Sequence, residues 1–305
     1  MKHPVVAVFL AACLATVACP VSAGMPRVPG SGQSEIPAPR PANSASAQAM
    51  QIPSHGALMN ALVYVAAGAG PHPVVILLHG FPGNERNLDL AQDMRRAGWD
   101  VMYFNYRGSW GTPGDFSFAH SIEDTHAAVA YLRQPDVARS LRLDPDRIVL
   151  IGHSMGGFMA VEAAAADPAI KAFATISAAD MAGRMQAVVG KEKRPEAIAA
   201  MAHGLAEEGM APLAGCTPDG LANELAGHVA SWPFMDKVGA LKDRTALIVT
   251  SDDGLAQDNN TFAAALRRAG DHHVATTHLP TDHLYSDKRI ELSHAILEWL
   301  AGLPK

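Results

Sequence analysis

Residues 152–156 carry the strongest chemical signal in the chain, because Gly-His-Ser-Met-Gly fits the pattern Gly-x-Ser-x-Gly. The apolar, β-branched run 148–151 comes just before and predicts a buried parallel strand. The alanine-rich run 158–166 comes just after and predicts a helix. A sharp turn between the two would place the Ser154 hydroxyl at a helix N-terminus, where the helix dipole favours developing negative charge. The pattern therefore predicts a nucleophilic serine.

A serine hydroxyl needs a general base, because its pKa lies far above 7. His283 follows the predicted strand 274–279 and is the candidate for that base. An acid that orients the imidazole is expected after an earlier strand, and Asp253 follows the predicted strand 245–250. Asp252 is the alternative, since neighbouring loop residues point in different directions and only one of the two can face the histidine.

A second loop is expected to bind the negative oxygen of a tetrahedral intermediate. Residues 79–83, His-Gly-Phe-Pro-Gly, end the predicted strand 74–78. An oxyanion needs N–H donors that are fixed in advance. The backbone N–H groups of Phe81 and Met155 are the expected pair, and the two glycines would let the loop approach the serine.

The other histidines do not suggest a metal. His153 is expected to pack beside the serine without reacting. His272 and His273 are adjacent and would point apart, and no carboxylate lies at ligand spacing from them. We expect neither a metal nor another cofactor.

Strands and helices alternate from residue 55 onward, which predicts an α/β domain with a parallel sheet covered on both faces. Ser121 is expected to cap the N-terminus of its helix. The predicted strands are 74–78, 99–106, 148–151, 170–176, 245–250 and 274–279, and the main predicted helices are 88–97, 121–132, 158–166, 262–269 and 289–300.

Over residues 55–305 the chain resembles the α/β-hydrolases. The motifs at 79–83 and 152–156, with Asn-Tyr-Arg-Gly-Ser at 105–109, are similar to dienelactone hydrolase-like proteins and to the catalytic domain of prolyl oligopeptidase-type enzymes. The resemblance implies an α/β-hydrolase fold and the chain order serine, acid, histidine. It favours Asp253 over Asp252, because an acid, a turn and small apolar residues follow one another at 253–256.

This resemblance implies a serine hydrolase that cleaves carboxylic esters through an acyl-serine intermediate. Hydrolysis of acyl-aminoacyl or oligopeptide substrates is the alternative, although no counterpart of the peptidases' β-propeller is present. A non-catalytic binding module on the same fold is an alternative of a different class. The expected partner is accordingly a small ester or a short peptide, and the oligomeric state stays open.

Residues 180–240 interrupt the alternation, since no strand pattern occurs between 179 and 241. Two helical candidates lie there, at 195–207 and 218–230. Loops at the carboxyl ends of parallel strands surround the binding site of such folds. We therefore expect a small helical lid over Ser154 that selects the acyl group.

The N-terminus has the features of an export signal. Residues 1–23 combine a weakly basic start, an apolar stretch and a small-residue cleavage site at 21–23. Cys13 and Cys19 each lie in a sequence similar to a lipoprotein box, so membrane association is expected only if one of them carries lipid. Residues 24–54 are rich in Pro, Gly, Ser and Ala and are predicted to be a disordered linker. We expect a periplasmic or secreted protein, or a membrane-anchored lipoprotein.

Composition excludes some partners and supports one large domain. The chain has 305 residues, of which 49% are hydrophobic, and a formal net charge of −6. An acidic chain without a basic stripe is a poor nucleic-acid binder. Beyond the leader only Cys216 remains, so the mature chain can form no internal disulfide and must be stable through its core.

Overall fold

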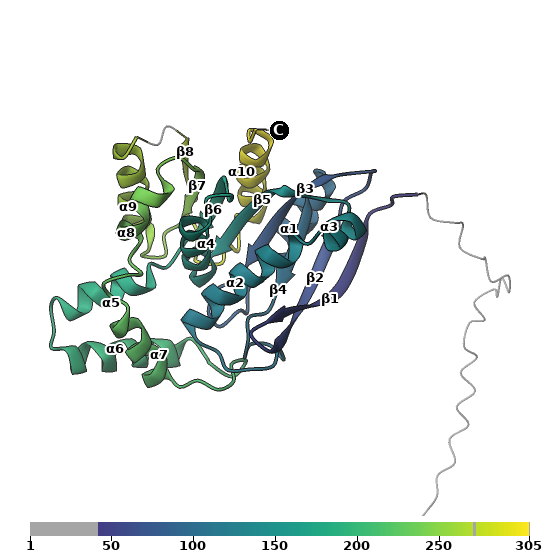
Figure 1. Cartoon of the computed structure of the whole chain (residues 1–305). Helices are drawn as coiled ribbons and strands as arrows, with labels where there is room; N and C mark the ends of the chain where they lie inside the picture. Colours follow the sequence, from purple (N-terminus) through teal and green to yellow (C-terminus); the bar gives the residue numbers. More distant parts are fainter. Residues whose placement is uncertain (1–41, 271–272, 305) are drawn as a thin grey trace, which may run out of the picture. The chain divides into compact units, whose positions relative to one another are not determined.

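The computed structural model describes residues 42–270 and 273–304, which contain a single eight-stranded sheet. Its strand order is β1-β2-β4-β3-β5-β6-β7-β8. The pairs β1–β2 and β2–β4 are antiparallel and all other pairs are parallel, which confirms the predicted α/β class (Figure 1). The strands are β1 Ser46–Ser54, β2 Ala57–Val65, β3 His72–Leu78, β4 Asp100–Phe104, β5 Leu143–His153, β6 Ala172–Ile176, β7 Thr245–Thr250 and β8 Val274–His278.

Helices cover both faces of the sheet, and side chains that alternate along β3 build the two cores. Val74 and Ile76 face a core that includes α2, α4 and α9, whereas Val75 and Leu77 face one that includes α1 and α10. The helices are α1 Leu88–Arg96, α2 Phe118–Leu132, α3 Pro135–Leu141, α4 Met155–Ala166, α5 Met181–Val189, α6 Arg194–Glu207, α7 Pro218–Gly227, α8 Phe234–Leu241, α9 Ala256–Arg268 and α10 Arg289–Ala301.

The linker prediction for 24–54 is wrong over its last nine residues, because 46–54 form strand β1. This edge strand pairs with β2 over its whole length, from Ser46 opposite Val65 to Ser54 opposite Ala57. The composition of β1 gives no clear strand pattern, since Ile52 is the one large apolar residue of this strand that is fully buried. Backbone pairing at the sheet edge compensates for the weak apolar pattern. Residues 1–41, with Cys13 and Cys19, lie outside the described part of the chain.

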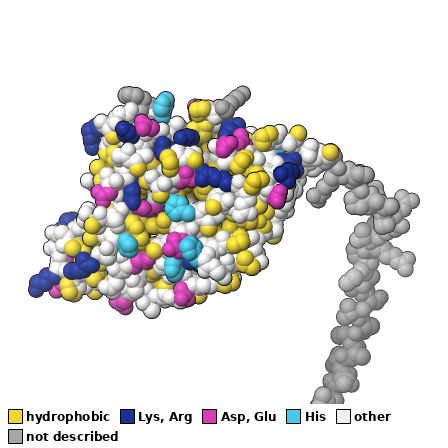
Figure 2. All heavy atoms as spheres, in the orientation of Figure 1, with side chains coloured by type: hydrophobic (Ala, Val, Ile, Leu, Met, Phe, Trp, Pro, Cys, Tyr) yellow, Lys and Arg dark blue, Asp and Glu magenta, His cyan; other side chains and the backbone are white. Residues whose placement is uncertain are grey.

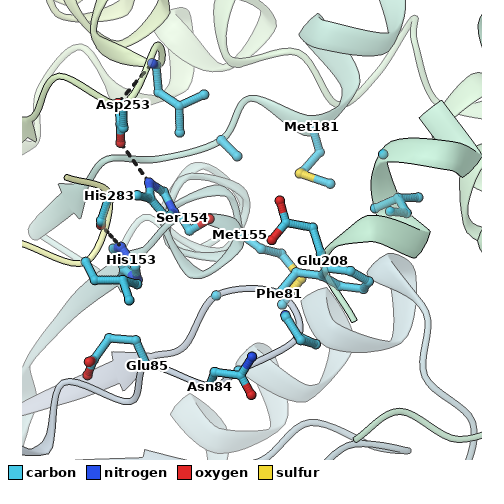
Figure 3. A pocket seen from close by; sticks show the side chains of 18 of the residues that line it. Phe81, Asn84, Glu85, His153, Ser154, Met155, Met181, Glu208, Asp253 and His283 are labelled. Carbon is cyan, nitrogen blue, oxygen red and sulfur yellow. Dashed lines mark hydrogen bonds and ion pairs between the residues drawn. The ribbon is translucent and has the colours of Figure 1, made fainter. Parts of the chain in front are cut away.

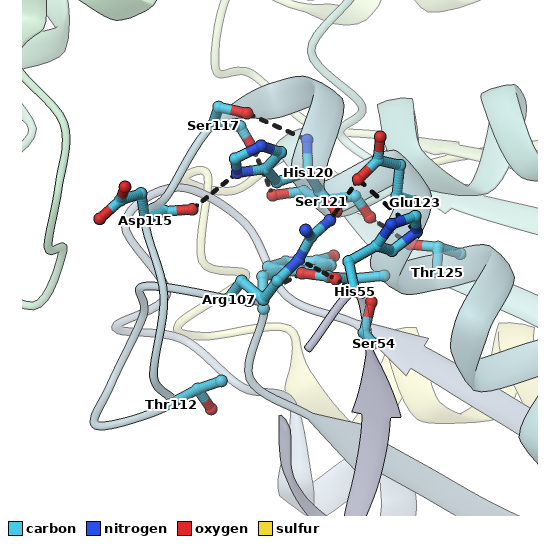
Figure 4. Close-up of polar contacts among 12 residues, drawn as sticks. Ser54, His55, Arg107, Thr112, Asp115, Ser117, His120, Ser121, Glu123 and Thr125 are labelled. Atoms are coloured by element: carbon cyan, nitrogen blue, oxygen red, sulfur yellow. Dashed lines mark hydrogen bonds and ion pairs between the residues drawn. The ribbon is translucent and has the colours of Figure 1, made fainter. Parts of the chain in front are cut away.

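A buried ion pair fastens β1 to the rest of the domain. The Arg107 side chain donates from Nε to Asp124 Oδ1 at 2.6 Å and also pairs with Glu123, both on α2. Ser54, at the end of β1, donates from Oγ to the same Asp124 oxygen at 2.6 Å. Figure 4 shows Arg107 reaching from its loop toward α2. Because Asp124 is fully buried, these partners supply the hydrogen bonds that its carboxylate requires.

The predicted cap of α2 is wrong by four residues. The helix begins at Phe118, and Ser117 caps it by accepting a hydrogen bond from the His120 amide at 3.0 Å. Ser121 lies within the helix and donates its hydroxyl proton to the Ser117 carbonyl oxygen. The two serines carry the same sequence signal, and the extended backbone at Ser117 (φ −152°) decides which of them is the cap.

Between β6 and β7 the chain forms four helices, α5 to α8, and no strand. Helices α6 and α7 correspond to the two predicted candidates, whereas α5 and α8 are short and lacked a clear pattern. Figure 1 shows α5, α6 and α7 packed together beside the sheet. Asp180 anchors this insertion by accepting from the amides of Gly183 and Phe234.

The surface and the helices add two observations on partners. On the face in Figure 2, basic side chains are interspersed with acidic ones instead of forming one basic patch. None of the helices within residues 42–270 and 273–304 has the length and hydropathy needed to cross a membrane.

Asp100, the first residue of β4, is fully buried, and no ion pair reaches it from the described residues, although the charge of Arg142 lowers its pKa somewhat. Its Oδ1 accepts from the Ala66 amide at 2.7 Å, while its Oδ2 has no partner among the described residues. Burial penalises the ionised form and raises the pKa of Asp100 to about 7. Between the unfolded pKa of 3.8 and this value, the folded protein holds a proton that the unfolded chain has lost.

Asp100→Asn should therefore change how stability depends on pH. In the wild type this carboxyl lowers the free energy of unfolding as pH rises from 5 to 8, by roughly 2–3 kcal/mol. The buried His79 and His153, whose pKa values burial lowers, act in the opposite direction in both proteins. Urea unfolding at pH 5 and pH 8 should show the amide variant losing less stability, or gaining more, than the wild type. Identical pH dependences would contradict the assignment.

Candidate active site

Ser154 lies at a strained turn where β5 ends and α4 begins. Its backbone has φ +56° and ψ −120°, which L side chains rarely adopt. Neighbouring strands hold the turn: the Ser154 amide donates to the Ile176 carbonyl oxygen at 2.9 Å. The Ser154 carbonyl oxygen accepts from the amides of Gly157 and Ala179. Strain of this kind persists where surrounding structure over-determines it and is often found at functional sites.

The glycines of the motif are required by close backbone contact. A Cβ on Gly152 would lie 2.0 Å from the Gly156 carbonyl oxygen, and a Cβ on Gly156 would lie 2.0 Å from the Leu78 carbonyl oxygen. A Cβ on Gly80 would lie 2.9 Å from the Cβ of Ser154. The 79–83 loop therefore runs directly against the serine, as its glycines indicated.

The structure brings His283 and Asp253 together, as Figure 3 shows. His283 Nδ1 lies 2.7 Å from Asp253 Oδ2, and the Asp253 side chain is only 3% exposed. Asp252 has a side chain that is 65% exposed and pairs instead with His278 Nε2 at 3.2 Å. Of the two neighbouring carboxylates, Asp253 is the one that can orient His283.

Asp253 stays ionised although it is buried. Burial alone would raise its pKa, but hydrogen bonds from His283, from Ser177 and from the Leu255 amide hold the pKa of Asp253 well below its ordinary value. A permanently negative carboxylate is suited to fix the proton of His283 on Nδ1 and to stabilise an imidazolium.

A buried hydroxyl network supports Asp253 from behind, and sequence reasoning missed it. Ser177 Oγ lies 2.8 Å from the Tyr285 hydroxyl and 3.0 Å from Ser251 Oγ. Tyr285 is fully buried two residues after His283, so the network also ties down the histidine loop. Ser177 and Tyr285 both have positive φ. A serine or tyrosine in a loop gives no sequence signal for a buried hydrogen bond between hydroxyls.

His153 supports the same loop from the other side. It is buried, its Nε2 donates to the His283 carbonyl oxygen at 2.8 Å, and the two rings lie 4.7 Å apart. Burial lowers the pKa of His153 to about 3, so the ring is neutral at physiological pH. A neutral ring that holds the backbone of His283 matches the packing role expected from the sequence.

Ser154, His283 and Asp253 line one cavity of about 630 Å³. Phe81 and Met155 line it too, and so do residues of α5 and α6 from the insertion. Met155 is the first residue of α4, where amides have no acceptor inside the helix. Among the described residues Ser154 Oγ makes no hydrogen bond to His283, a contact that often tightens only when substrate binds.

The run 105–109, the third motif of the resemblance, makes structural contacts. Tyr106 is fully buried and its hydroxyl reaches the His79 carbonyl oxygen at 3.4 Å. Gly108 has φ +66°, and a Cβ there would lie 2.2 Å from the Phe116 amide nitrogen. With Arg107 bound to α2, this run braces the 79–83 loop from outside the cavity. None of its residues lines the cavity.

No cluster of three or more His, Cys, Asp or Glu side chains within the described residues is arranged to hold a metal ion. His272, one of the adjacent pair considered above, lies outside them. Cys216 is a free, half-buried thiol.

Comparison with known proteins identifies the family of the chain. The family model described as "Alpha/beta hydrolase family" matches residues 75–292. The chain belongs to the alpha/beta hydrolase family. The matched range includes Ser154, Asp253 and His283.

Solved structures of several esterases share this alpha/beta hydrolase fold. A carboxyl esterase of Bacillus coagulans has a TM-score of 0.63 at 16% identity, covering 85% of this chain and 99% of that one. An esterase of Pyrococcus furiosus has a TM-score of 0.60 at 15% identity, covering 84% and 91%. An esterase of Pyrobaculum calidifontis has a TM-score of 0.59 at 21% identity, covering 83% and 84%. At these identities the likeness establishes the fold.

Two curated relatives match over shorter segments. A quorum-quenching protein of Acinetobacter baumannii is 29% identical over 124 residues, which are 39% of each chain. An uncharacterized protein of Mycobacterium tuberculosis is 34% identical over 107 residues, which are 34% of this chain and 35% of that one. The match thus spans about two fifths or less of the length of these relatives.

Proposed function

We propose that this hydrolase cleaves carboxylic esters through an acyl-serine intermediate. Ser154 is the nucleophile, His283 the general base and Asp253 the acid that orients it. The observation that carries the proposal is the 2.7 Å contact between Asp253 and His283 Nδ1 in the cavity that Ser154 lines. Strained backbone at Ser154 and ionised Asp253 support the same assignment.

The mechanism follows from the tautomer that Asp253 selects. With its proton on Nδ1, His283 presents the Nε2 lone pair and takes the hydroxyl proton as Ser154 attacks the ester carbonyl. The N–H groups of Phe81 and Met155 bind the resulting oxyanion. His283 then protonates the leaving alcohol, and a water molecule repeats the sequence to release the acid. None of these steps requires a cofactor.

Two observations favour esters over amides as substrates. The fold is shared with several proteins described as esterases, and none of the residues 105–109 lines the cavity of Ser154. A panel of p-nitrophenyl esters and aminoacyl p-nitroanilides separates the two chemistries, since a peptidase would turn over the anilides as well as the esters, and an esterase only the esters.

Ser154→Ala should lower turnover of the best p-nitrophenyl ester by roughly 10⁴- to 10⁶-fold, because it removes the attacking oxygen. A fluorophosphonate should label the wild type once, at Ser154, and leave the variant unlabelled. Ser140→Ala, which removes an exposed hydroxyl on α3, is the matched control and should keep full activity. A Ser154→Ala protein with a tenth of wild-type turnover would sink the assignment.

Asp253→Asn should reduce kcat by about 10⁴-fold, because an amide facing His283 favours the wrong tautomer. Asp252→Asn is the matched control and should retain activity within a few-fold, since Asp252 is exposed and pairs with His278. Steady-state kinetics with the same ester compares the two. A larger loss of kcat in Asp252→Asn than in Asp253→Asn would show that Asp252, and not Asp253, orients His283.

We also propose that the protein is exported, on the basis of the leader sequence alone. Intact-mass measurement of the chain from a bacterial envelope fraction should give a mature protein that begins near Gly24 or carries lipid on Cys13 or Cys19. Recovery of the full-length chain from the cytoplasm would refute export.

A further inference from the structure

A second cavity of about 560 Å³ lies beside the one that holds Ser154. It is bounded by α5, α6, the start of α8 and the first half of α9. The two cavities share three lining residues: Arg184 on α5, and Met201 and Gly204 on α6. They therefore adjoin along the line where α5 faces α6.

The pattern on α6 shows where the boundary runs. Met201, Gly204 and Leu205 line the cavity of Ser154, which is the i, i+3, i+4 spacing of one helix face, and Glu208, the residue that follows α6, lines it too. Ala200, Met201 and Gly204 line the second cavity. Met201 and Gly204 thus stand at the edge between the two faces.

This boundary consists of groups that offer little resistance to opening. The Arg184 side chain is exposed, and its guanidinium makes no hydrogen bond or ion pair in the described part of the chain. Met201 carries a flexible thioether chain. Gly204 has no side chain at all, although glycine is disfavoured inside a helix and a Cβ there would meet nothing within 4 Å. Helix stability alone would favour a larger residue at 204.

The second cavity suits an apolar group. Val188, Phe234, Met235 and Phe262 line it, and the Met235 side chain is 48% exposed although it is large and apolar. Its charged lining consists of Arg184 at the boundary and the carboxylates of Asp180 and Asp258.

We propose that the two cavities form one substrate cleft, and that the enzyme acts on esters with a long, flexible apolar arm that passes Arg184, Met201 and Gly204 into the second cavity. The inference rests on the proposed ester hydrolysis at Ser154. It adds the substrate class: esters with an octyl-length or longer hydrocarbon arm, on either the acyl or the alcohol side.

The test places a side chain at the boundary. Gly204→Leu should fold, because its Cβ meets open space, and should fill the passage. Gly239→Leu on α8 is the matched control: it too is an exposed helical glycine with nothing within 4 Å of a built Cβ, and it lines neither cavity. Two series are compared, p-nitrophenyl acetate to dodecanoate and ethyl to dodecyl acetate, which separate an acyl arm from an alcohol arm.

In the wild type, kcat/KM should rise from butyl to octyl length in one of the two series, by up to about fourfold per buried methylene. Gly204→Leu should lower the octyl-to-butyl ratio at least tenfold, and Gly239→Leu should leave it unchanged. An unchanged ratio in Gly204→Leu, or a wild type that prefers acetyl and ethyl arms in both series, would overturn the proposal.

A binding measurement keeps the inference separate from the proposed chemistry. Calorimetry on Ser154→Ala with 2-dodecanone and 2-hexanone, which carry the carbonyl but no leaving group, should show tighter binding of the long ketone. The double variant with Gly204→Leu should bind the two ketones equally well. Equal binding of the two ketones by Ser154→Ala alone would refute the long-arm cleft. If the wild type instead turned over no ester and a fluorophosphonate did not label Ser154, the proposed function would be refuted.

Discussion

The site depends on the contact of three backbones where β5 turns into α4. The chain can turn there only because Gly152 and Gly156 lack side chains, since a Cβ on either would lie 2.0 Å from a carbonyl oxygen. The same contact forces Ser154 into positive φ and presses the 79–83 loop against it. The serine, the first amides of α4 and the Phe81 loop are therefore positioned by one packing constraint.

Parallel strands bring the other residues to the same edge of the sheet. Asp253 follows β7 and His283 follows β8, and these strands pair in register from Ala246 opposite Val274 to Thr250 opposite His278. Carboxyl ends of parallel strands meet at one edge, so two loops far apart in sequence become neighbours. The low pKa of Asp253 then depends on donors from several segments, His283, Ser177 and Leu255, which only the folded sheet assembles.

Motifs with strict steric or periodic requirements could be predicted from the sequence, and features set by tertiary contacts could not. Strand β7 has the predicted bounds because its apolar run is continuous. The glycines around Ser154 predict a sharp turn, because residues with a Cβ do not fit there. Strand β1 could not be predicted, because its stability comes from pairing with β2 and from Ser54 on Asp124. Ser177 and Tyr285 gave no signal, because a buried hydroxyl pair depends on two loops meeting.

Helix α4 links Ser154 to the insertion between β6 and β7. Its first turn follows Ser154, and its third turn carries Glu162, which is buried and pairs with Lys237 of α8 at 2.7 Å. Burial raises the pKa of Glu162 to about 7, so Lys237 is the contact that favours its ionised form. Phe234, at the start of α8, packs on Phe158 of α4 and on Phe262 of α9. The C-terminal end of the insertion is thus fixed to the helix that begins at the serine. Because α4 also begins directly after Ser154, one helix positions both the serine and this end of the insertion.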